Sequence, residues 1–257
     1  MKIIIIPYRD RKAQKAIFLN HMNKILKNVK LIFVHQKDKR YFNRGAMRNI
    51  GFLYVKKNYT DWKNITFIFH DIDYLPYKKI FSYETIKGEI KHFYGFKTTL
   101  GGIWAIKGSD YEAINGYPNY WGWGFEDNKI KDNWIKFGGK INYDEFISYT
   151  SRDVVKLDSS VQEHDNRIIN KYNLWHAKNG NIHSSGFHTI RNLKYTTQID
   201  DNIIMIHVTA FDTEQKEQNQ HFIKNISSAQ IKLDNKRRSK RRQRYRFYHK
   251  PEFKMLF

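Results

Sequence analysis

The sequence predicts an α/β fold in which a Rossmann-like, nucleotide-binding mixed sheet is flanked by helices. The aliphatic runs are short, as at residues 3–6 and 67–69, and helical patterns follow them. Runs of this length in this order are typical of buried strands in a largely parallel sheet. At 257 residues the chain suits one such domain, or one domain with an appendage. No apolar run approaches the length of a membrane span.

The first half of the chain alternates strands and helices. The predicted strands are residues 2–7, 30–35 and 66–70. One predicted helix follows the first strand and ends near Leu26, and a second follows the second strand and begins at Phe42-Asn43-Arg44. Apolar residues recur on one face of both helices. The third strand ends in Asp71-Ile72-Asp73.

The alternation weakens in the second half. The predicted elements are strands over 92–96, 103–106 and 202–208, a helix over 109–114 capped by Ser109, a helix from Glu126 to Phe137 and a helix over 213–231. Gly138-Gly139 ends the helix that begins at Glu126. Residues 148–192 are polar and weakly periodic, which predicts a long loop or lid.

The formal net charge of +21 predicts attraction to nucleotides, anionic glycans, nucleic acid or acidic membranes, without choosing among them. Part of the excess is local, in a basic tail formed by Lys236, Arg237, Arg238, Lys240, Arg241, Arg242, Arg244 and Arg246. The chain has no cysteine, and Met1 and Lys2 lead directly into the first strand without a secretory signal. We therefore expect a cytoplasmic protein.

Two carboxylates, Asp71 and Asp73, follow the third predicted strand directly. An α/β sheet places its ligand crevice at this end of its strands. Side chains at i and i+2 after a strand point in different directions, so one can bind a hard cation while the other accepts hydrogen bonds from a sugar or ribose. For a lone Asp-x-Asp, a polar loop after a strand is the better interpretation, so the neighbouring motifs decide.

Aromatic and cationic residues end the first two strands. Pro7-Tyr8-Arg9-Asp10-Arg11 closes the first, and Phe42-Asn43-Arg44 follows the second. Cations here suit a base, a ribose or a pyrophosphate. Together with the Asp-Ile-Asp turn, these groups predict a nucleotide diphosphate site at one edge of the sheet.

Residues 116–127 read Gly-Tyr-Pro-Asn-Tyr-Trp-Gly-Trp-Gly-Phe-Glu-Asp. A glycine- and tryptophan-rich segment that runs into a carboxylate pair joins an aromatic surface to a candidate general base. Aromatic turns over a core, and acidic residues favoured at a helix start, would give the same composition without a function.

These motifs, in this order and with Gly101-Gly102 between them, resemble the beta-1,4-galactosyltransferase family. The resemblance covers residues 2–165 well and extends loosely to about residue 208. It implies the GT-A fold and inverting transfer of galactose or N-acetylgalactosamine from a UDP-sugar. The expected organisation is a GT-A domain over 1–210, with a long flexible lid loop, followed by a helical and basic C-terminal extension over 211–257.

The resemblance also implies the roles of individual residues. The donor-binding residues it implies are Pro7, Tyr8, Arg9, Arg11, Phe42, Arg44, Asp71, Asp73, Thr99, Gly102, Trp123, Gly124 and Glu126. Trp123, on a small flexible loop, would close over the donor, and Trp121, Trp123 and Glu126 would contact the acceptor. Asp127 would be the catalytic base, because an inverting displacement needs one base for the acceptor hydroxyl.

The expected metal is Mn²⁺ or Mg²⁺, bound by Asp73 and His164. The family places a methionine three residues before this histidine, and this chain has Val161 there. Loss of a thioether ligand leaves the choice between the two ions open, with water or Glu163 as a replacement. His176, His183, His188 and His207 are the rival histidines.

A second departure concerns the donor sugar. Galactose-transferring members have a tyrosine two positions before the glycine pair, whereas this chain has Thr99. A smaller side chain leaves room for an N-acetyl group, so we expect UDP-N-acetylgalactosamine to be at least tolerated, with galactose and glucose as rivals.

The expected acceptor is a glycan, glycolipid or glycoprotein. The family's secretory members have an anchor and disulfides, and their absence here predicts a bacterial or viral enzyme whose basic tail could hold it at an anionic membrane. The alternatives are a basic nucleic-acid-binding protein, which would explain the tail but none of the motifs before residue 128, and a catalytically idle sugar-binding relative.

Overall fold

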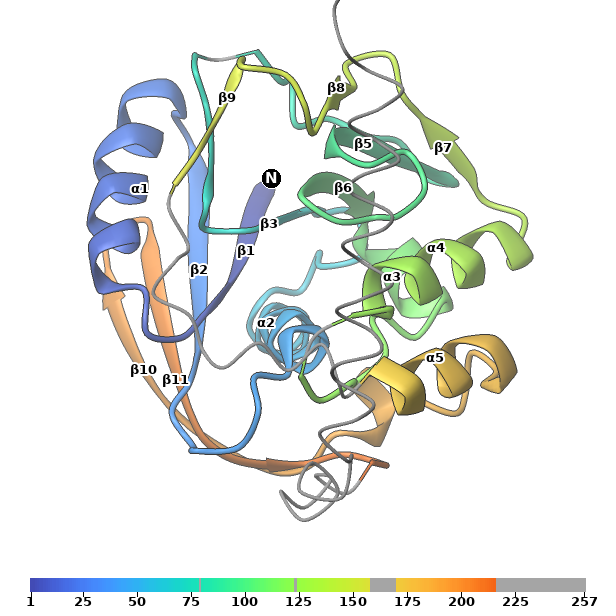
Figure 1. Ribbon diagram of the computed structural model, residues 1–257. Coiled ribbons are helices and arrows are strands. Elements are labelled where there is room, and N and C mark those ends of the chain that lie inside the picture. Colours follow the sequence, from blue (N-terminus) through green and yellow to red (C-terminus); the bar gives the residue numbers. More distant parts are fainter. Residues whose placement is uncertain (79, 123, 158–169, 216–257) are drawn as a thin grey trace, which may run out of the picture. The chain divides into compact units, whose positions relative to one another are not determined.

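A mixed β-sheet runs through the fold, with its strands in the order β10-β11-β2-β1-β3-β6-β5-β7 and β8 paired to β5 (Figure 1). The computed structural model describes residues 1–78, 80–122, 124–157 and 170–215. The strands of this sheet are β1 (Lys2–Tyr8), β2 (Val29–Gln36), β3 (Thr66–His70), β5 (Glu89–Gly95), β6 (Ile103–Lys107), β7 (Lys140–Asn142), β8 (Ile147–Ser148), β10 (Arg191–Asp200) and β11 (Ile203–Asp212). Strands β4 (Tyr74–Pro76) and β9 (Val154–Lys156) form a separate antiparallel pair.

Parallel pairing dominates the middle of the sheet. Strand β1 lies between β2 and β3 and is parallel to both, and β11 is parallel to β2. Strand β6 is antiparallel to β3 and β5, and β10 is antiparallel to β11. The carboxyl ends of β1, β2, β3 and β11 therefore meet at one edge, where an α/β sheet places its ligands.

Helices cover both faces of this sheet. They are α1 (Lys12–Ile25), α2 (Arg44–Asn58), α3 (Gly108–Ala113), α4 (Glu126–Lys136) and α5 (Asn170–Asn179), with a 3-10 turn η2 (Phe187–Thr189). Successive strand residues point to opposite faces. Ile5 accordingly shares a buried cluster with Met47 of α2, whereas Ile4 shares another with Phe18 of α1. The sheet thus separates two apolar layers, with α1 on one face and α2 on the other.

The structure confirms most of the predicted elements up to residue 137. The five strands predicted in this part correspond to β1, β2, β3, β5 and β6, with ends that differ by a few residues. Asn43 caps α2 by accepting a hydrogen bond from the backbone amide of Ala46. Helix α4 begins at Glu126, as predicted, and ends at Lys136.

Several predictions beyond these are wrong. Ser109 lies inside α3, whose N-cap is Lys107 and has no side-chain cap. Residues 148–192 are not one loop, because α5, η2 and β9 lie within them. The last predicted strand is longer than expected, and its partner β10 was not predicted. Residues 213–215 are not helical. The rest of that predicted helix, and the basic tail, lie outside the described residues.

Candidate functional site

Three elements bring charged side chains together at the carboxyl edge of the sheet. Helix α2 supplies Arg44 and Arg48, which lie one helical turn apart on the same face. Strand β3 ends immediately before Asp71, and α4 begins with Glu126 and Asp127. We call these five residues the Arg–Asp cluster.

Arg44 and Arg48 connect the three carboxylates of the cluster. Arg44 donates from Nε to Glu126 Oε1 at 2.8 Å and from Nη2 to Asp127 Oδ2 at 3.0 Å, and its Nη1 lies 3.5 Å from Asp71 Oδ2. Arg48 donates from Nη1 to Asp127 Oδ1 at 2.9 Å and from Nη2 to Asp71 Oδ1 at 2.6 Å. Both guanidinium groups therefore hold Asp71 and Asp127 from the same helix.

Burial and charge act in opposite directions on these carboxylates. Burial alone would raise the pKa of Asp71, but the charges of Arg48 and Arg44 bring it below its usual value. Burial, together with the charge of Glu126, raises the pKa of Asp127 to about 6, although both arginines oppose the shift. A carboxylate whose pKa lies near the working pH is suited to accept and release a proton.

Asp127 also lies against the Gly101-Gly102 turn. A Cβ added to Gly101 would come within 2.8 Å of Asp127 Oδ2. The backbone carbonyl of Asp127 accepts a hydrogen bond from Leu100, and the carbonyl of Gly102 accepts one from Asp71. Thr99 lies in the preceding turn, where its amide donates to the carbonyl of Phe96. The glycine pair thus lets the turn approach both aspartates of the cluster.

The segment that leads into α4 has an unusual backbone. Phe125 has a φ of 70°, in the left-handed region, and Gly124 before it has a φ of 112°. A left-handed conformation is costly for an aromatic residue and recurs at functional sites. It turns the chain so that Glu126 and Asp127 point into the cluster at the start of the helix.

Asp73, the predicted metal ligand, lies two residues beyond Asp71, and the charges of Asp71 and Arg44 act on its pKa. It forms an ion pair with Arg11, whose Nε lies 3.7 Å from Asp73 Oδ1. That oxygen is buried and receives no hydrogen bond from the described residues. Burial raises the pKa of Asp73 to about 6. A buried carboxylate oxygen with an unused lone pair fits a bound cation.

The histidine proposed as the second metal ligand lies outside the described part of the chain. Among the described residues, no group of three or more Asp, Glu or His side chains is close enough to hold a metal ion. His164, Val161 and Glu163 lie outside the described residues, as does Trp123. His207, a rival histidine, lies on β11 with its Nδ1 3.2 Å from Nδ1 of His35.

The predicted donor residues at the ends of β1 and β2 do come together. The guanidinium carbon of Arg9 lies 5.2 Å from the centre of the Phe42 ring. The ring of Tyr8 is buried edge-on against His35, at a centroid distance of 4.9 Å. Pro7, the preceding residue of β1, pairs with Val34 of β2. Cationic and aromatic groups therefore share this edge, as the motifs predicted.

Trp121 lies in the core. It is 3% exposed, its ring stacks on Phe211 at 5.2 Å, and the guanidinium carbon of Arg40 lies 4.5 Å from its ring centre. Its predicted contact with an acceptor stays a prediction, which this packing does not support.

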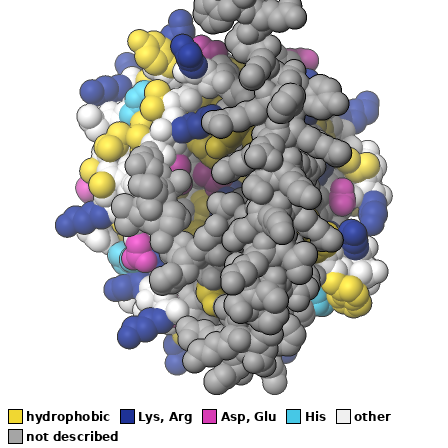
Figure 2. Space-filling model, viewed as in Figure 1, with side chains coloured by type: hydrophobic (Ala, Val, Ile, Leu, Met, Phe, Trp, Pro, Cys, Tyr) yellow, Lys and Arg dark blue, Asp and Glu magenta, His cyan; other side chains and the backbone are white. Residues whose placement is uncertain are grey.

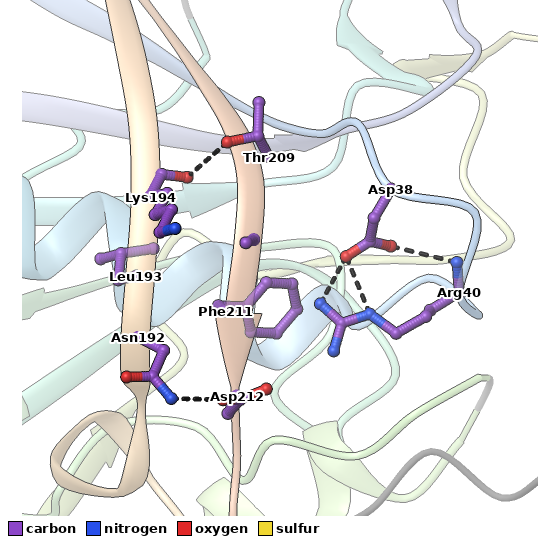
Figure 3. A pocket seen from close by; sticks show the side chains of 9 residues that line it. Asp38, Arg40, Asn192, Leu193, Lys194, Thr209, Phe211 and Asp212 are labelled. Atoms are coloured by element: carbon purple, nitrogen blue, oxygen red, sulfur yellow. Dashed lines mark hydrogen bonds and ion pairs between the residues drawn. The ribbon is translucent and has the colours of Figure 1, made fainter.

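A pocket of about 620 Å³ lies beside this stack, between β10, β11 and the loop after β2 (Figure 3). Two pairs of its polar side chains bond each other: Arg40 donates to Asp38, and Asn192 donates to Asp212. None of the predicted site residues lines it. The pocket is therefore separate from the Arg–Asp cluster.

Two residues of the site were not predicted from the sequence. Arg48 fits the helical pattern of α2 as one more basic residue, and its spacing of four from Arg44 was the available signal. His92 on β5 is fully buried, and its Nε2 lies 3.0 Å from the carbonyl of Gly101. It therefore supports the glycine turn that faces Asp127.

Two family models match the chain. The N-terminal region of glycosyl transferase group 7 matches residues 1–85, and the N-terminal domain of galactosyltransferase matches residues 85–152. Together they span β1 to β8, the cluster and the glycine turn.

Curated relatives agree with these matches. Xylosylprotein 4-beta-galactosyltransferase of Caenorhabditis elegans is 29% identical over 220 residues, which are 77% of this chain and 73% of that protein. Human beta-1,4-galactosyltransferase 7 is 33% identical over 140 residues, which are 49% of this chain and 41% of the human protein. The matched region thus spans about two fifths of this mammalian relative.

A solved structure has the same fold. A mutant of Drosophila beta-1,4-galactosyltransferase 7, in complex with manganese, UDP-Gal and xylobiose, superposes with a TM-score of 0.64 at 20% identity. The match covers 84% of this chain and 94% of that chain. The mixed α/β architecture described above is therefore that of a known catalytic domain.

Proposed function

The chain belongs to glycosyl transferase group 7, and on this premise we propose that it transfers galactose from UDP-galactose to a hydroxyl group of a glycan or glycoconjugate. The transfer proceeds with inversion and forms a β linkage. The observation that carries the proposal is the Arg–Asp cluster, in which Asp127 lies beside Asp71 at the carboxyl edge of the sheet.

Asp127 is the proposed base. Each of its oxygens accepts one hydrogen bond from an arginine, which leaves a lone pair on each for an acceptor hydroxyl. Its pKa of about 6 lets it exist as the carboxylate at neutral pH and take up the proton as the hydroxyl attacks. The proton moves from the acceptor oxygen to a carboxylate oxygen of Asp127.

Two other carboxylates have proposed binding roles. Glu126 is held by Arg44 and is placed to bind sugar hydroxyls, and Asp71 is placed to accept hydrogen bonds from the donor. Asp73 would hold the divalent cation, with His164 as a further ligand, and Mn²⁺ is the first candidate because the Drosophila relative was solved with manganese. When bound, the cation would neutralise charge on the departing diphosphate.

The donor is galactose in the names of the relatives, and Thr99 adds a second prediction. Without the tyrosine ring, UDP-N-acetylgalactosamine should also be accepted. Rates with UDP-galactose, UDP-N-acetylgalactosamine and UDP-glucose, measured on wild type and Thr99→Tyr, test this. We expect the substitution to reduce use of the N-acetylated donor more than use of UDP-galactose. A wild-type enzyme strictly specific for UDP-galactose would contradict the prediction.

The first acceptors to test are β-xylosides. The nematode relative is named for a xylosylprotein acceptor, and the Drosophila relative was solved with xylobiose. Glucosides and N-acetylglucosaminides complete the panel, because the described residues contain no assigned acceptor contact beyond Glu126 and Trp121.

The transfer assay is the test of the whole proposal. The full chain is incubated with UDP-galactose, Mn²⁺ and the acceptor panel, and products are measured by mass spectrometry with the linkage assigned by NMR. We expect a β-galactoside with wild type and a loss of about a hundredfold or more with Asp127→Asn, since general base catalysis contributes that much. Absence of transfer with every UDP-sugar, or near-normal transfer by Asp127→Asn, would overturn it.

A further inference from the structure

We propose that Arg48 is a positioning residue that locks Asp127 and Asp71 into one fixed arrangement from beneath the site. The inference rests on the proposed function, in which Asp127 is the base. It assigns a role to a residue that none of the sequence motifs included.

The geometry of Arg48 is that of a bridge. Two different nitrogens of one guanidinium bind carboxylates from two different elements, at 2.9 Å to Asp127 and 2.6 Å to Asp71. Separate nitrogens at fixed spacing set both the distance and the relative orientation of the two acids. The ring of Tyr117 lies below, 4.5 Å from the guanidinium carbon, and limits its movement.

Arg48 differs from Arg44 in access. The side chain of Arg48 is 0% exposed, whereas that of Arg44 is 22% exposed and is shared among three carboxylates. Arg44 can therefore meet a ligand directly. Arg48 has no exposed surface with which to do so, and it acts on a substrate only through Asp71 and Asp127.

Stability alone is a poor reason for this arginine. A buried ion pair gains little over well-packed apolar side chains, because both charges must leave water. Arg48 also has a further cost, since its Nε is buried without a hydrogen-bond partner among the described residues. Apolar side chains in place of Arg48 and its carboxylate partners together would fill this space at lower cost, so the charge of Arg48 has another use.

That use is control of the charge on Asp127. The groups that act on Asp127 are Arg44 and Arg48 from α2, Glu126 from α4, Asp71 after β3, and Tyr117 below the cluster. The three carboxylates share two guanidinium groups. Removal of Arg48 leaves Arg44 as the guanidinium that serves Asp71, Glu126 and Asp127, so Asp127 holds its proton to a higher pH.

The test compares Arg48→Met and Arg48→Lys in the full chain, with kcat/KM for transfer measured from pH 5.5 to 9. In Arg48→Met the acidic limb of the kcat/KM profile should move to higher pH by about one unit. At low pH kcat/KM should therefore fall about tenfold, and it should recover as the pH rises. Arg48→Lys keeps the charge and should leave the limb near its wild-type position. One ammonium cannot replace two separate nitrogens, so we expect its kcat to fall at every pH.

Lys129→Met is the matched control. Lys129 lies on α4 and, like Arg48, is a buried cation. Its side chain donates to the backbone carbonyls of Ala177 and Gly180 and does not touch the cluster. The Lys129→Met substitution should lower the midpoint of thermal unfolding without moving the acidic limb of the kcat/KM profile. A pH-independent loss in Arg48→Met that matches Lys129→Met, or a wild-type kcat in Arg48→Lys, would overturn the inference.

A ¹³C titration of the Asp127 carboxyl carbon, assigned with Asp127→Asn and recorded without donor, separates the two proposals. The pKa should be higher in Arg48→Met than in wild type, whether or not transfer occurs. An unchanged pKa would refute the role of Arg48 even in an active enzyme. An enzyme without transfer activity but with a raised pKa in Arg48→Met would refute only the proposed function.

Discussion

Gly101 lies so close to Asp127 that any side chain there would meet the carboxylate, at 2.8 Å from Oδ2. Its backbone is not in the left-handed region, so alanine fits the chain itself, and the clash falls on the side chain of Asp127. A residue without catalytic groups thus fixes where the proposed base can lie.

We therefore expect Gly101→Ala to lower the transfer rate by about tenfold or more, because small displacements of reacting groups are costly. Gly88→Ala is the control. Gly88 has a φ of +80° and nothing within 4 Å of an added Cβ, so alanine there costs stability through backbone strain without touching the site. Transfer by Gly101→Ala equal to that of Gly88→Ala would contradict the prediction.

At the scale of residues, the sequence predicts those site side chains that belong to recognisable motifs. Arg44, Asp71, Glu126 and Asp127 were predicted, and the structure brings them together. Arg48 was missed because a basic residue in a helical pattern is typical of a solvated face. Its burial depends on α4 and β3, which approach α2 only in the folded chain.

Among the elements, α2 supplies both arginines of the cluster, and Asn43 is the N-cap at which this helix begins. The Asn43 side chain accepts from the amide of Ala46 and donates to the carbonyl of Asn119, and it is fully buried. The start of α2 is thereby tied to the segment that leads into α4.

Asn43→Ala should lower the free energy of unfolding by about 1–3 kcal/mol, since it removes a helix cap and leaves a buried carbonyl without its donor. Asn43→Asp keeps the cap but loses the amide donor, and it serves as the partial control. Urea unfolding measures both. A loss below about 0.5 kcal/mol in Asn43→Ala would show that the cap is dispensable.

His92 on strand β5 makes a pH-dependent contribution to the stability of the fold. Burial lowers the pKa of His92 from 6.5 to about 4, although its hydrogen bonds to the carbonyls of Gly101 and Tyr94 oppose the shift. Between these values the unfolded chain binds a proton that the folded chain does not. The contribution of neutral His92 to stability is therefore complete above pH 6.5 and is lost as the pH falls toward 4.

His92→Gln should consequently flatten the pH dependence. The difference in unfolding free energy between pH 6.5 and pH 5 should shrink by about 1.5 kcal/mol relative to wild type. His35 and His70 also have lowered pKa values, but they titrate in both proteins and their contributions cancel. An unchanged pH dependence would mean that His92 is protonated or accessible in the folded protein.

The elements that sequence reasoning missed have weak local signals. Strand β10 is exposed or half-exposed along its whole length, so it lacks the apolar run that identifies a buried strand. Helix α5 is short and packs against α4, where Lys129 donates to the carbonyl of Ala177. Tertiary contacts, rather than sequence periodicity, specify both.

At the scale of the whole molecule, the positive charge of the surface is spread widely, whereas the proposed site is one local cluster. Figure 2 shows described Lys and Arg side chains scattered around the visible face, with acidic and apolar side chains between them. No helix of the described residues has the length and apolar character needed to cross a membrane. The excess positive charge gives general attraction to anions, whereas specificity belongs to the cluster.

Thermal shift distinguishes the two effects. UDP with Mn²⁺ should raise the melting temperature of the full chain, and Asp73→Asn should reduce that shift because the proposed metal ligand is lost. Short duplex DNA should give no comparable shift at 0.15 M salt, and any low-salt binding should weaken steeply as salt is added. A salt-resistant shift with DNA would instead favour the nucleic-acid alternative.

The basic tail supports a separate prediction about membranes. Full-length protein should bind vesicles that contain anionic lipid, and a chain of residues 1–235 should not, because it lacks the clustered Lys and Arg residues. Transfer to a soluble acceptor should be unchanged by the truncation. Equal vesicle binding by both proteins would show that the tail is not responsible.

The non-sequential order of the sheet also has a consequence for synthesis of the protein. Strand β2 ends at Gln36, yet β11, which pairs with its outer edge, begins at Ile203. At about 5–20 residues per second, a ribosome needs about 8 to 33 s to make the intervening chain. During that interval the apolar edge of β2 is open, and an open edge invites pairing with other chains. The nascent protein should therefore depend on chaperones until β11 has emerged.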